Sequence, residues 1–175
     1  AYHKTRRLPY IYSDEELTSL IKTALLLGPP NSLRPYTYAN LIALLSVTGL
    51  RISEALRLQF SDITPDGLLI CNTKFRKSRL VPLHDSVVLG LERYLIRRQS
   101  LLSVSKEVFI TDEGQKLSYP SVHYTFKKLL KSAKLLSPPG VAQPRLHDFR
   151  HRFAVNSLLH SSPDRKSVSQ HMLAL

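Results

Sequence analysis

The stretch TGLRISEALRL, residues 48–58, lies where two apolar helical segments meet, and it places a charged residue at their joint. The residues before it, 36–49, are apolar on most sides, which predicts a central helix that ends at Gly49. A short helix is expected directly after Arg51, and helix N-termini attract anions. Arg51 therefore either pairs with Glu54 to brace the turn or is held by Glu54 in position for a phosphate, and the two roles are compatible.

Further helices are predicted on both sides of this joint, because apolar residues recur at helical spacing. Their ends carry local signals. Ser13 and Glu16 form a capping box, Asp85 can cap the next helix, and prolines at 120 and 163 suit first turns. Besides the last helix, which Pro163 opens, the predicted segments are 13–28, closed by Gly28, then 86–99, 121–134 and 146–160.

Two short β-prone runs follow the joint, LLICNT at 68–73 and SRLVPL at 78–83, and they predict a hairpin. The run EVFIT at 107–111 is a candidate third strand, whereas SDITPDG at 61–67 is typical of a turn. No repeat or second domain is apparent. The sequence therefore predicts a single α+β domain over 1–175, mainly α-helical, with helices around a small three-stranded antiparallel sheet.

The balance of charge points to a polyanionic partner. Lysine and arginine number 25 against 13 for aspartate and glutamate, which gives a net charge of +12 and a pI near 10.0. Such a chain attracts nucleic acid over long range, although a ribosomal-type or merely basic protein would share this composition. We therefore expect nucleic acid as the partner.

Several classes of protein are disfavoured. No apolar run approaches the ~18 residues that a membrane span needs, and no signal-peptide pattern opens the chain. Cys71 is the single cysteine, which excludes an internal disulfide and fits a reducing compartment. The chain lacks a glycine-rich phosphate loop and a carboxylate cluster for two Mg²⁺ ions, so any phosphoryl transfer is expected to be metal-free.

A second basic stretch, RLHDFRHR at 145–152, places candidate catalytic residues on one predicted helix. His147 and Arg150 are three apart, so their side chains share a face. They suit a phosphate, because arginine can bind two of its oxygens and histidine can exchange a proton with a third. A solvated basic helix start would contain the same residues without giving them a role.

His147 and His151 also match the four-residue spacing of the zinc helix H-E-x-x-H. Asp148 stands where that motif needs glutamate, and Arg150 and Arg152 would repel a dication. Zinc hydrolysis is therefore disfavoured.

The predicted hairpin carries a third basic cluster, KFRKSR at 74–79. It is either a solvated turn or a positively charged finger that enters a groove of DNA. Lysine suits the second role, because one ammonium group can bind phosphate or give a proton to a leaving alkoxide.

Taken together, TGLRISEALRL, NTKFRKSRLVPL and LHDFRHRFAVNSLL resemble the catalytic domain of the tyrosine recombinases, the phage-integrase family. The resemblance runs from about Ser13 to the C-terminus. It implies helices around a small sheet and DNA strand exchange without metal, ATP or another cofactor. Arg51 matches the first catalytic arginine, and Lys74 matches the lysine that protonates the leaving 5′-oxygen. His147 and Arg150 match the H-x-x-R pair.

The resemblance also implies that a tyrosine attacks the scissile phosphate and leaves a 3′-phosphotyrosyl link with a free 5′-hydroxyl. The arginines and the histidine would stabilise the charge of the five-coordinate phosphorus. A second 5′-hydroxyl can reverse the attack, because the covalent link conserves the phosphodiester energy. The remaining basic residues of the motifs are expected contacts to double-stranded DNA: Arg76, Lys77, Arg79, Arg145 and Arg152.

The sequence departs from the family's pattern near its end. No leucine-glycine precedes His171, so the family's second histidine is not assigned to it, and no tyrosine follows Tyr124. The family's N-terminal DNA-clamping domain is also missing. We therefore expect a piece of a longer recombinase that lacks the nucleophile, binds DNA weakly and forms no covalent adduct. The family acts as a tetramer on DNA, whereas this piece could be a monomer.

Two other hypotheses stay open. A degenerate relative would only bind DNA, and a relative of type IB topoisomerases would share the chemistry, although the first and third motifs disfavour it. The recombinase hypothesis implies a cytoplasmic protein, encoded by a bacterium, a phage or another mobile element, with no membrane partner.

Overall fold

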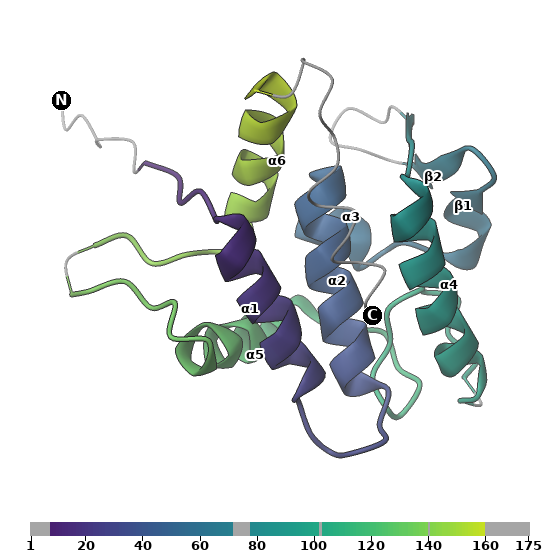
Figure 1. Ribbon diagram of the computed structural model, residues 1–175. Helices are drawn as coiled ribbons and strands as arrows, with labels where there is room; N and C mark the ends of the chain where they lie inside the picture. The colour runs from purple at the N-terminus through teal and green to yellow at the C-terminus, as the bar shows by residue number, and fades with distance from the viewer. Residues whose placement is uncertain (1–7, 72–77, 102, 140, 160–175) are drawn as a thin grey trace, which may run out of the picture.

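The computed structural model describes residues 8–71, 78–101, 103–139 and 141–159 (Figure 1). The predicted site residues Lys74, Arg76 and Lys77, and the segment with Pro163 and His171, lie outside these residues. Within them the order of elements is α1 (Asp14–Leu25), α2 (Arg34–Thr48), α3 (Ile52–Ala55), η1 (Phe60–Asp62), β1 (Ile63–Thr64), β2 (Gly67–Ile70), β3 (Arg79–Val81), α4 (Asp85–Gln99), α5 (Tyr119–Ser132) and α6 (Asp148–Leu159).

Helix α2 is the central element and lies between α1 and α4, with α6 also packed against it (Figure 1). It is buried on nearly all sides, as expected for a helix without a polar face. It ends at Gly49, whose backbone is left-handed with φ 61° and whose N–H donates to the carbonyl of Leu45. The prediction of a central helix that stops at Gly49 is confirmed.

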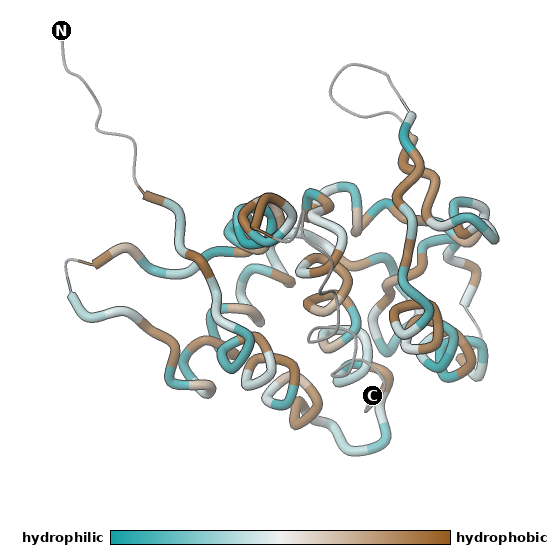
Figure 2. Tube along the Cα trace, turned by 45° about the horizontal axis from the view of Figure 1, so that its top comes forward, coloured by the Kyte–Doolittle hydropathy of each residue, from teal (hydrophilic) through white to brown (hydrophobic). Residues whose placement is uncertain are grey.

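Capping explains where the outer helices begin. The N–H of Glu16 donates to the Ser13 hydroxyl, and the N–H of Ser13 donates to the Glu16 carboxylate, so the predicted capping box of α1 is confirmed. The buried residues of this helix recur three or four apart, as an amphipathic helix requires, and Figure 2 shows both hydrophobic and hydrophilic segments along it. The predicted cap of α4 is wrong, because His84 accepts from the N–H of Ser86. Asp85 is already the first helical residue, where its carboxylate suits the helix dipole.

Two further predicted helix ends have different outcomes. Pro120 lies in the first turn of α5, as predicted, behind an N-cap serine. Helix α1 ends at Leu25, before the predicted stop at Gly28. The chain tightens there, since the N–H groups of Leu26 and Leu27 each donate to a carbonyl three residues back.

The sheet has three antiparallel strands in the order β1-β2-β3, as predicted, but one strand is not the expected one. The third strand is β1, whose Ile63 pairs with Leu68. It lies inside residues 61–67, for which the sequence predicts only a turn. Residues 107–111 form isolated bridges instead. Their apolar side chains are buried in the core, and the N–H of Val108 donates to the carbonyl of Leu58. A short apolar run of this kind does not by itself distinguish a sheet strand from another buried segment.

Aromatic contacts fix α6 against the rest of the core. Phe149 is fully buried and stacks on Tyr12, with ring centroids 4.6 Å apart. It also packs edge-on against Phe126 of α5, at 5.8 Å. The direction of α6, and so of its exposed residues, is set by these rings. Across the part of the chain that the structure describes, no helix is long and apolar enough to cross a lipid bilayer.

Candidate phosphate-binding site

The centre of the site is the carboxylate of Glu54 in the short helix α3, whose side chain is only 3% exposed. It accepts from the backbone N–H and the guanidinium of Arg51, at 2.9 and 3.0 Å. It also accepts two hydrogen bonds from Arg79 of β3, at 3.1 and 2.7 Å. The predicted contact between Glu54 and Arg51 is confirmed, and Arg79 is a second partner that the sequence spacing did not indicate.

Burial and hydrogen bonding act on this carboxylate in opposite directions. Burial raises the pKa of Glu54, but the hydrogen bonds and charges of Arg79 and Arg51 outweigh it and lower the pKa to about 2. Glu54 is therefore ionised at neutral pH. A buried carboxylate is tolerated here because two guanidinium groups compensate its charge.

Arg150 of α6 reaches the same place from a distant part of the sequence. Its Nη1 donates to the carbonyl of Gly49 at 2.6 Å, across 101 residues of chain. Helix ends leave such carbonyls without a partner inside the helix. Burial lowers the pKa of Arg150, the charges of Arg51 and Arg79 lower it further, and the charge of Glu54 raises it. We call Arg51, Arg79, Arg150 and Glu54 the arginine cluster.

Gly49 allows the two helices to meet at this point. Its φ of +61° disfavours any residue with a side chain, and an added Cβ would lie 2.4 Å from the ring of Phe153 on α6. The close approach of α6 to the end of α2 therefore depends on glycine. It brings Arg150 within reach of the turn that carries Arg51.

His147 lies one residue before α6, rather than inside the helix as predicted. The N–H of Arg150 donates to the carbonyl of His147 at 3.1 Å, so the predicted pair is joined by one turn of backbone. The His147 ring lies edge-on to His151, with centroids 5.0 Å apart. Burial, and then the charge of His151, lowers the pKa of His147. The lowered pKa favours the neutral imidazole.

The Asp148 carboxylate, at the start of α6, is bound by Arg145. This buried carboxylate accepts from the backbone N–H of Arg145 at 2.9 Å and from the guanidinium at 3.1 and 2.8 Å. Among the described residues, no group of three His, Cys, Asp or Glu side chains could hold a metal ion. The Arg145 side chain is 43% exposed, so it keeps a face toward solvent.

Arg152 corrects one sequence prediction. Its side chain is buried, and its Nε donates to the carbonyl of Tyr12 at 3.0 Å. Its guanidinium also pairs with the carboxylate of Asp14. Arg152 therefore joins α6 to the start of α1 and is not available to DNA. No local pattern of residues indicates this role, because Arg152 and its partners are separated by almost the whole described chain.

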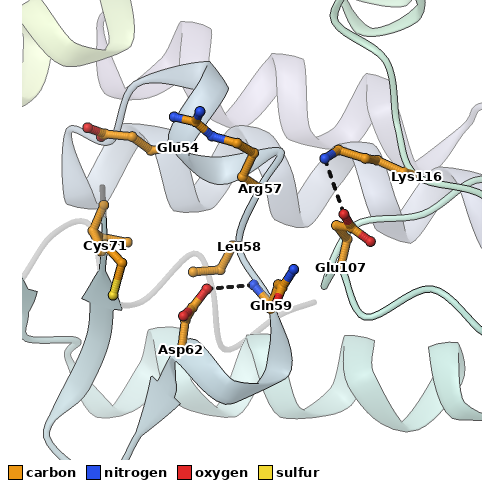
Figure 3. A pocket seen from close by; sticks show the side chains of 9 residues that line it. Glu54, Arg57, Leu58, Gln59, Asp62, Cys71, Glu107 and Lys116 are labelled. Carbon is orange, nitrogen blue, oxygen red and sulfur yellow. Dashed lines mark hydrogen bonds and ion pairs between the residues drawn. The ribbon is translucent and has the colours of Figure 1, made fainter. Parts of the chain in front are cut away.

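A cavity of about 310 Å³ opens beside Glu54 and was not predicted (Figure 3). Figure 3 shows the ion pair of Lys116 with Glu107, at 3.1 Å, across the cavity from Cys71. Three carboxylates and two cations line it, so it does not favour an anion as the arginine cluster does. The full lining is Glu54, Arg57, Leu58, Gln59, Asp62, Ile70, Cys71, Glu107 and Lys116.

Comparison with known proteins identifies the family of the chain. The family model described as the phage integrase family matches residues 12–173. The chain is 39% identical over 166 residues to the integrase/recombinase y4rB of Sinorhizobium fredii, covering 90% of this chain and 53% of that protein. It is 29% identical over 172 residues to the tyrosine recombinase XerD of Halalkalibacterium halodurans, covering 95% and 54%. The chain thus spans about half the length of these relatives.

A solved structure shares the fold at low sequence identity. A lambda integrase tetramer bound to a Holliday junction superposes with a TM-score of 0.68 at 20% identity, covering 99% of this chain and 49% of that one. The mainly helical architecture with a small antiparallel sheet, expected from the sequence, is therefore confirmed. Because the family model matches nearly the whole chain, the chain belongs to the phage integrase family, the tyrosine recombinases.

Proposed function

We propose that the protein containing this chain is a site-specific DNA recombinase, and that the chain supplies the phosphate-binding part of its active site. The arginine cluster carries the proposal. Guanidinium groups bind phosphate oxygens through paired N–H donors. Arg51 and Arg79 share the Glu54 carboxylate, and Arg150 is bound to the carbonyl of Gly49, two residues before Arg51. This leaves an excess of positive charge that a DNA phosphate would compensate.

In the proposed reaction a tyrosine hydroxyl gives its proton to a neighbouring base as its oxygen attacks the scissile phosphorus. The bond to the 5′-oxygen breaks, and that oxygen takes up a proton. Arg51 and Arg150 bind the non-bridging oxygens and stabilise the five-coordinate phosphorus. His147 hydrogen-bonds a further oxygen. Lys74, which matches the hairpin lysine of the family, is proposed to donate the proton to the 5′-oxygen.

The second half of the proposed reaction reverses the first. The 3′-phosphotyrosyl link conserves the phosphodiester energy, so a 5′-hydroxyl from another strand can displace the tyrosine and complete strand exchange. We expect no nucleotide cofactor for this reason. We assign the nucleophile to no tyrosine of this chain, and we propose that these 175 residues alone form no covalent adduct.

The proposed partner is double-stranded DNA, bound by a tetramer of the full-length protein. The net charge of +12 supports DNA binding. A tetramer is supported by the lambda integrase structure, which is described as a tetramer on a Holliday junction. The two curated relatives are proteins of bacterial species, so we propose action in the bacterial cytoplasm. Arg76, Lys77, Arg79 and Arg145 are the proposed further contacts to DNA.

A nicked duplex that carries the recombination site tests this function in the full-length protein. Cleavage beside the nick releases a short strand, so a covalent protein–DNA adduct accumulates and is seen by denaturing electrophoresis. We expect an adduct with the wild-type protein and none with Arg51→Ala. Arg97→Ala is the matched control, because Arg97 stacks on Tyr36 at the far end of α2, about 20 Å away. Wild-type protein that binds the duplex without any adduct would show a relative that only binds DNA.

A further inference from the structure

Arg79 of β3 binds the Glu54 carboxylate through its guanidinium group, as Arg51 does from the start of α3. The Nη1 atoms of both arginines donate to one oxygen, Oε1 of Glu54, at 3.0 and 3.1 Å. Two nitrogens that are each about 3 Å from one atom are at most about 6 Å apart. A phosphate can span such a gap by accepting a hydrogen bond from each nitrogen. The two guanidinium groups are therefore neighbours in one site.

Arg79 has hydrogen-bond donors left for a ligand. Its two bonds to Glu54 use two of the five N–H groups of a guanidinium. The side chain is 36% exposed, close to the 39% of Arg51, while the Glu54 side chain is 3% exposed. The carboxylate is thus buried beneath two arginines that both reach solvent.

The charges around Glu54 are not balanced by protein groups. Arg150 donates to a neutral carbonyl, and Arg51 and Arg79 share a single carboxylate. Within the described ranges, no second carboxylate forms an ion pair with any of the three. Three neighbouring cations with one anion form a site that an anionic ligand completes.

We propose that Arg79 is a third phosphate-binding residue, whose guanidinium donates to the same DNA phosphate as Arg51 and Arg150. This inference rests on the proposed function. Glu54 holds Arg51 and Arg79 side by side before DNA arrives, so little reorganisation is needed when the phosphate binds.

An Arg79 that only held Glu54 in place would be a positioning residue without contact to DNA. The two roles differ in one measurable respect. A direct contact makes the effect of removing Arg79 depend on the charge of the phosphate, whereas a positioning role does not.

Binding to two duplexes separates these roles in the full-length protein. One duplex carries the natural scissile phosphate and the other a methylphosphonate there, which removes a charged oxygen. We expect Arg79→Ala to weaken binding about tenfold on the natural duplex and less than about twofold on the neutral one. Arg150→Ala should behave alike, and Arg97→Ala should change both affinities equally. Equal weakening of both duplexes by Arg79→Ala overturns the proposal.

Salt dependence tests Arg79 on any duplex, without a known recombination site. Loss of one phosphate contact should reduce the slope of log affinity against log salt by about 0.9 for Arg79→Ala. The slope should stay unchanged for Arg97→Ala. An unchanged slope for Arg79→Ala overturns the proposal. Because this measurement needs no cleavage, it tests the phosphate contact of Arg79 even if the wild-type protein forms no adduct. Failure of this proposal can therefore be distinguished from failure of the proposed function.

The fold is expected to survive these substitutions. In Arg79→Ala, Glu54 keeps both hydrogen bonds from Arg51. If thermal melting shows that Arg79→Ala is unfolded, Arg79→Lys and Arg79→Gln replace it on the same two duplexes. Lysine should keep part of the difference between the duplexes and glutamine should lose it, while equal behaviour of the two overturns the proposal.

Discussion

Two regions of the molecule place a carboxylate against arginine, and they differ in how the charges balance. In the arginine cluster, two guanidinium groups share one buried carboxylate, and the third, Arg150, binds only a backbone carbonyl. At the start of α6, by contrast, each arginine has a carboxylate partner of its own. Arg145 pairs with Asp148, and Arg152 pairs with Asp14 at the start of α1. We call these two ion pairs the α6 ion pairs. The α6 ion pairs are neutral and join elements of the fold, whereas the arginine cluster has an excess of positive charge that can bind an anionic ligand.

The contrast is sharpest on a single helix. Arg150 and Arg152 are two residues apart on α6, so they point to different sides of it. One donates to the carbonyl of Gly49 at the cluster, and the other is buried against Tyr12. The residue type alone therefore does not identify a catalytic arginine. Under the proposed function, Arg150 differs from Arg152 in having no ion-pair partner among the described residues.

The largest expected effect is a separation of activity from stability on this helix. Arg150→Ala should lower the rate of adduct formation by about 10³-fold, because a donor to the transition-state charge is lost, with thermal stability close to wild type. Arg152→Ala should cost about 2 kcal/mol of stability, because its buried bonds are lost, with cleavage per folded molecule within a few-fold of wild type. Single-turnover cleavage and denaturant unfolding measure the two quantities. An inactive but stable Arg152→Ala would break the comparison.

The next largest effect is the pH dependence of stability that the buried Glu54 carboxylate causes. The pKa of Glu54 is lowered from 4.5 to about 2, so its ionised form stabilises the fold. This contribution, on the order of 3 kcal/mol, is complete above pH 4.5 and is lost as the pH falls through about 2. The unfolding free energies of wild type and Glu54→Gln should therefore differ by a constant amount near neutral pH and converge in acid. Glu92→Gln, on the exposed face of α4, is the control and should show little difference.

A smaller effect is expected where the two helices meet. Gly49→Ala combines a left-handed backbone with a clash against Phe153 and should cost about 2 kcal/mol. In Gly49→Ala/Phe153→Ala the clash is relieved but the backbone strain persists. The double variant should be less destabilised than the sum of the single variants, by about 1 kcal/mol in denaturant unfolding. Strict additivity would show that Phe153 does not restrict this position.

The smallest effect concerns the protonation of His147. Burial and His151 lower the pKa of His147 in the free protein. A phosphate beside the ring favours the imidazolium, so DNA binding should raise this pKa. Affinity should then increase as the pH falls through the bound-state pKa and level off below the free-state pKa. Proton and carbon NMR of the labelled ring, with and without duplex, measures the change. An unchanged pKa in the saturated complex would place His147 away from the phosphate.

Local features of this fold could be read from the sequence, because neighbouring residues determine them. The capping box of Ser13 and Glu16 and the helix stop at Gly49 each depend on a few adjacent residues, and both are confirmed. The bond between Arg51 and Glu54 belongs to the same class, since three residues separate the partners on a helix start.

Features that join distant parts of the chain were not predictable from spacing. The pairing of Arg79 with Glu54 and the burial of Arg152 arise only when elements pack. The third strand was misassigned for a similar reason. Residues 107–111 have the apolar composition of a strand, but the sheet takes its partner from 63–64, which pairs through a tight turn.

The hydrogen bond from Arg150 to Gly49 joins residues that are 101 positions apart, so the two are synthesised at different times. A ribosome that adds about 5–20 residues per second takes on the order of 5–20 s to pass from one residue to the other. During that interval a nascent chain contains Arg51 and, from residue 79 onward, Arg79, but it does not yet contain Arg150. Under the proposed function, the phosphate-binding site therefore stays incomplete until α6 has been synthesised, and we expect no DNA cleavage by a nascent chain before that point.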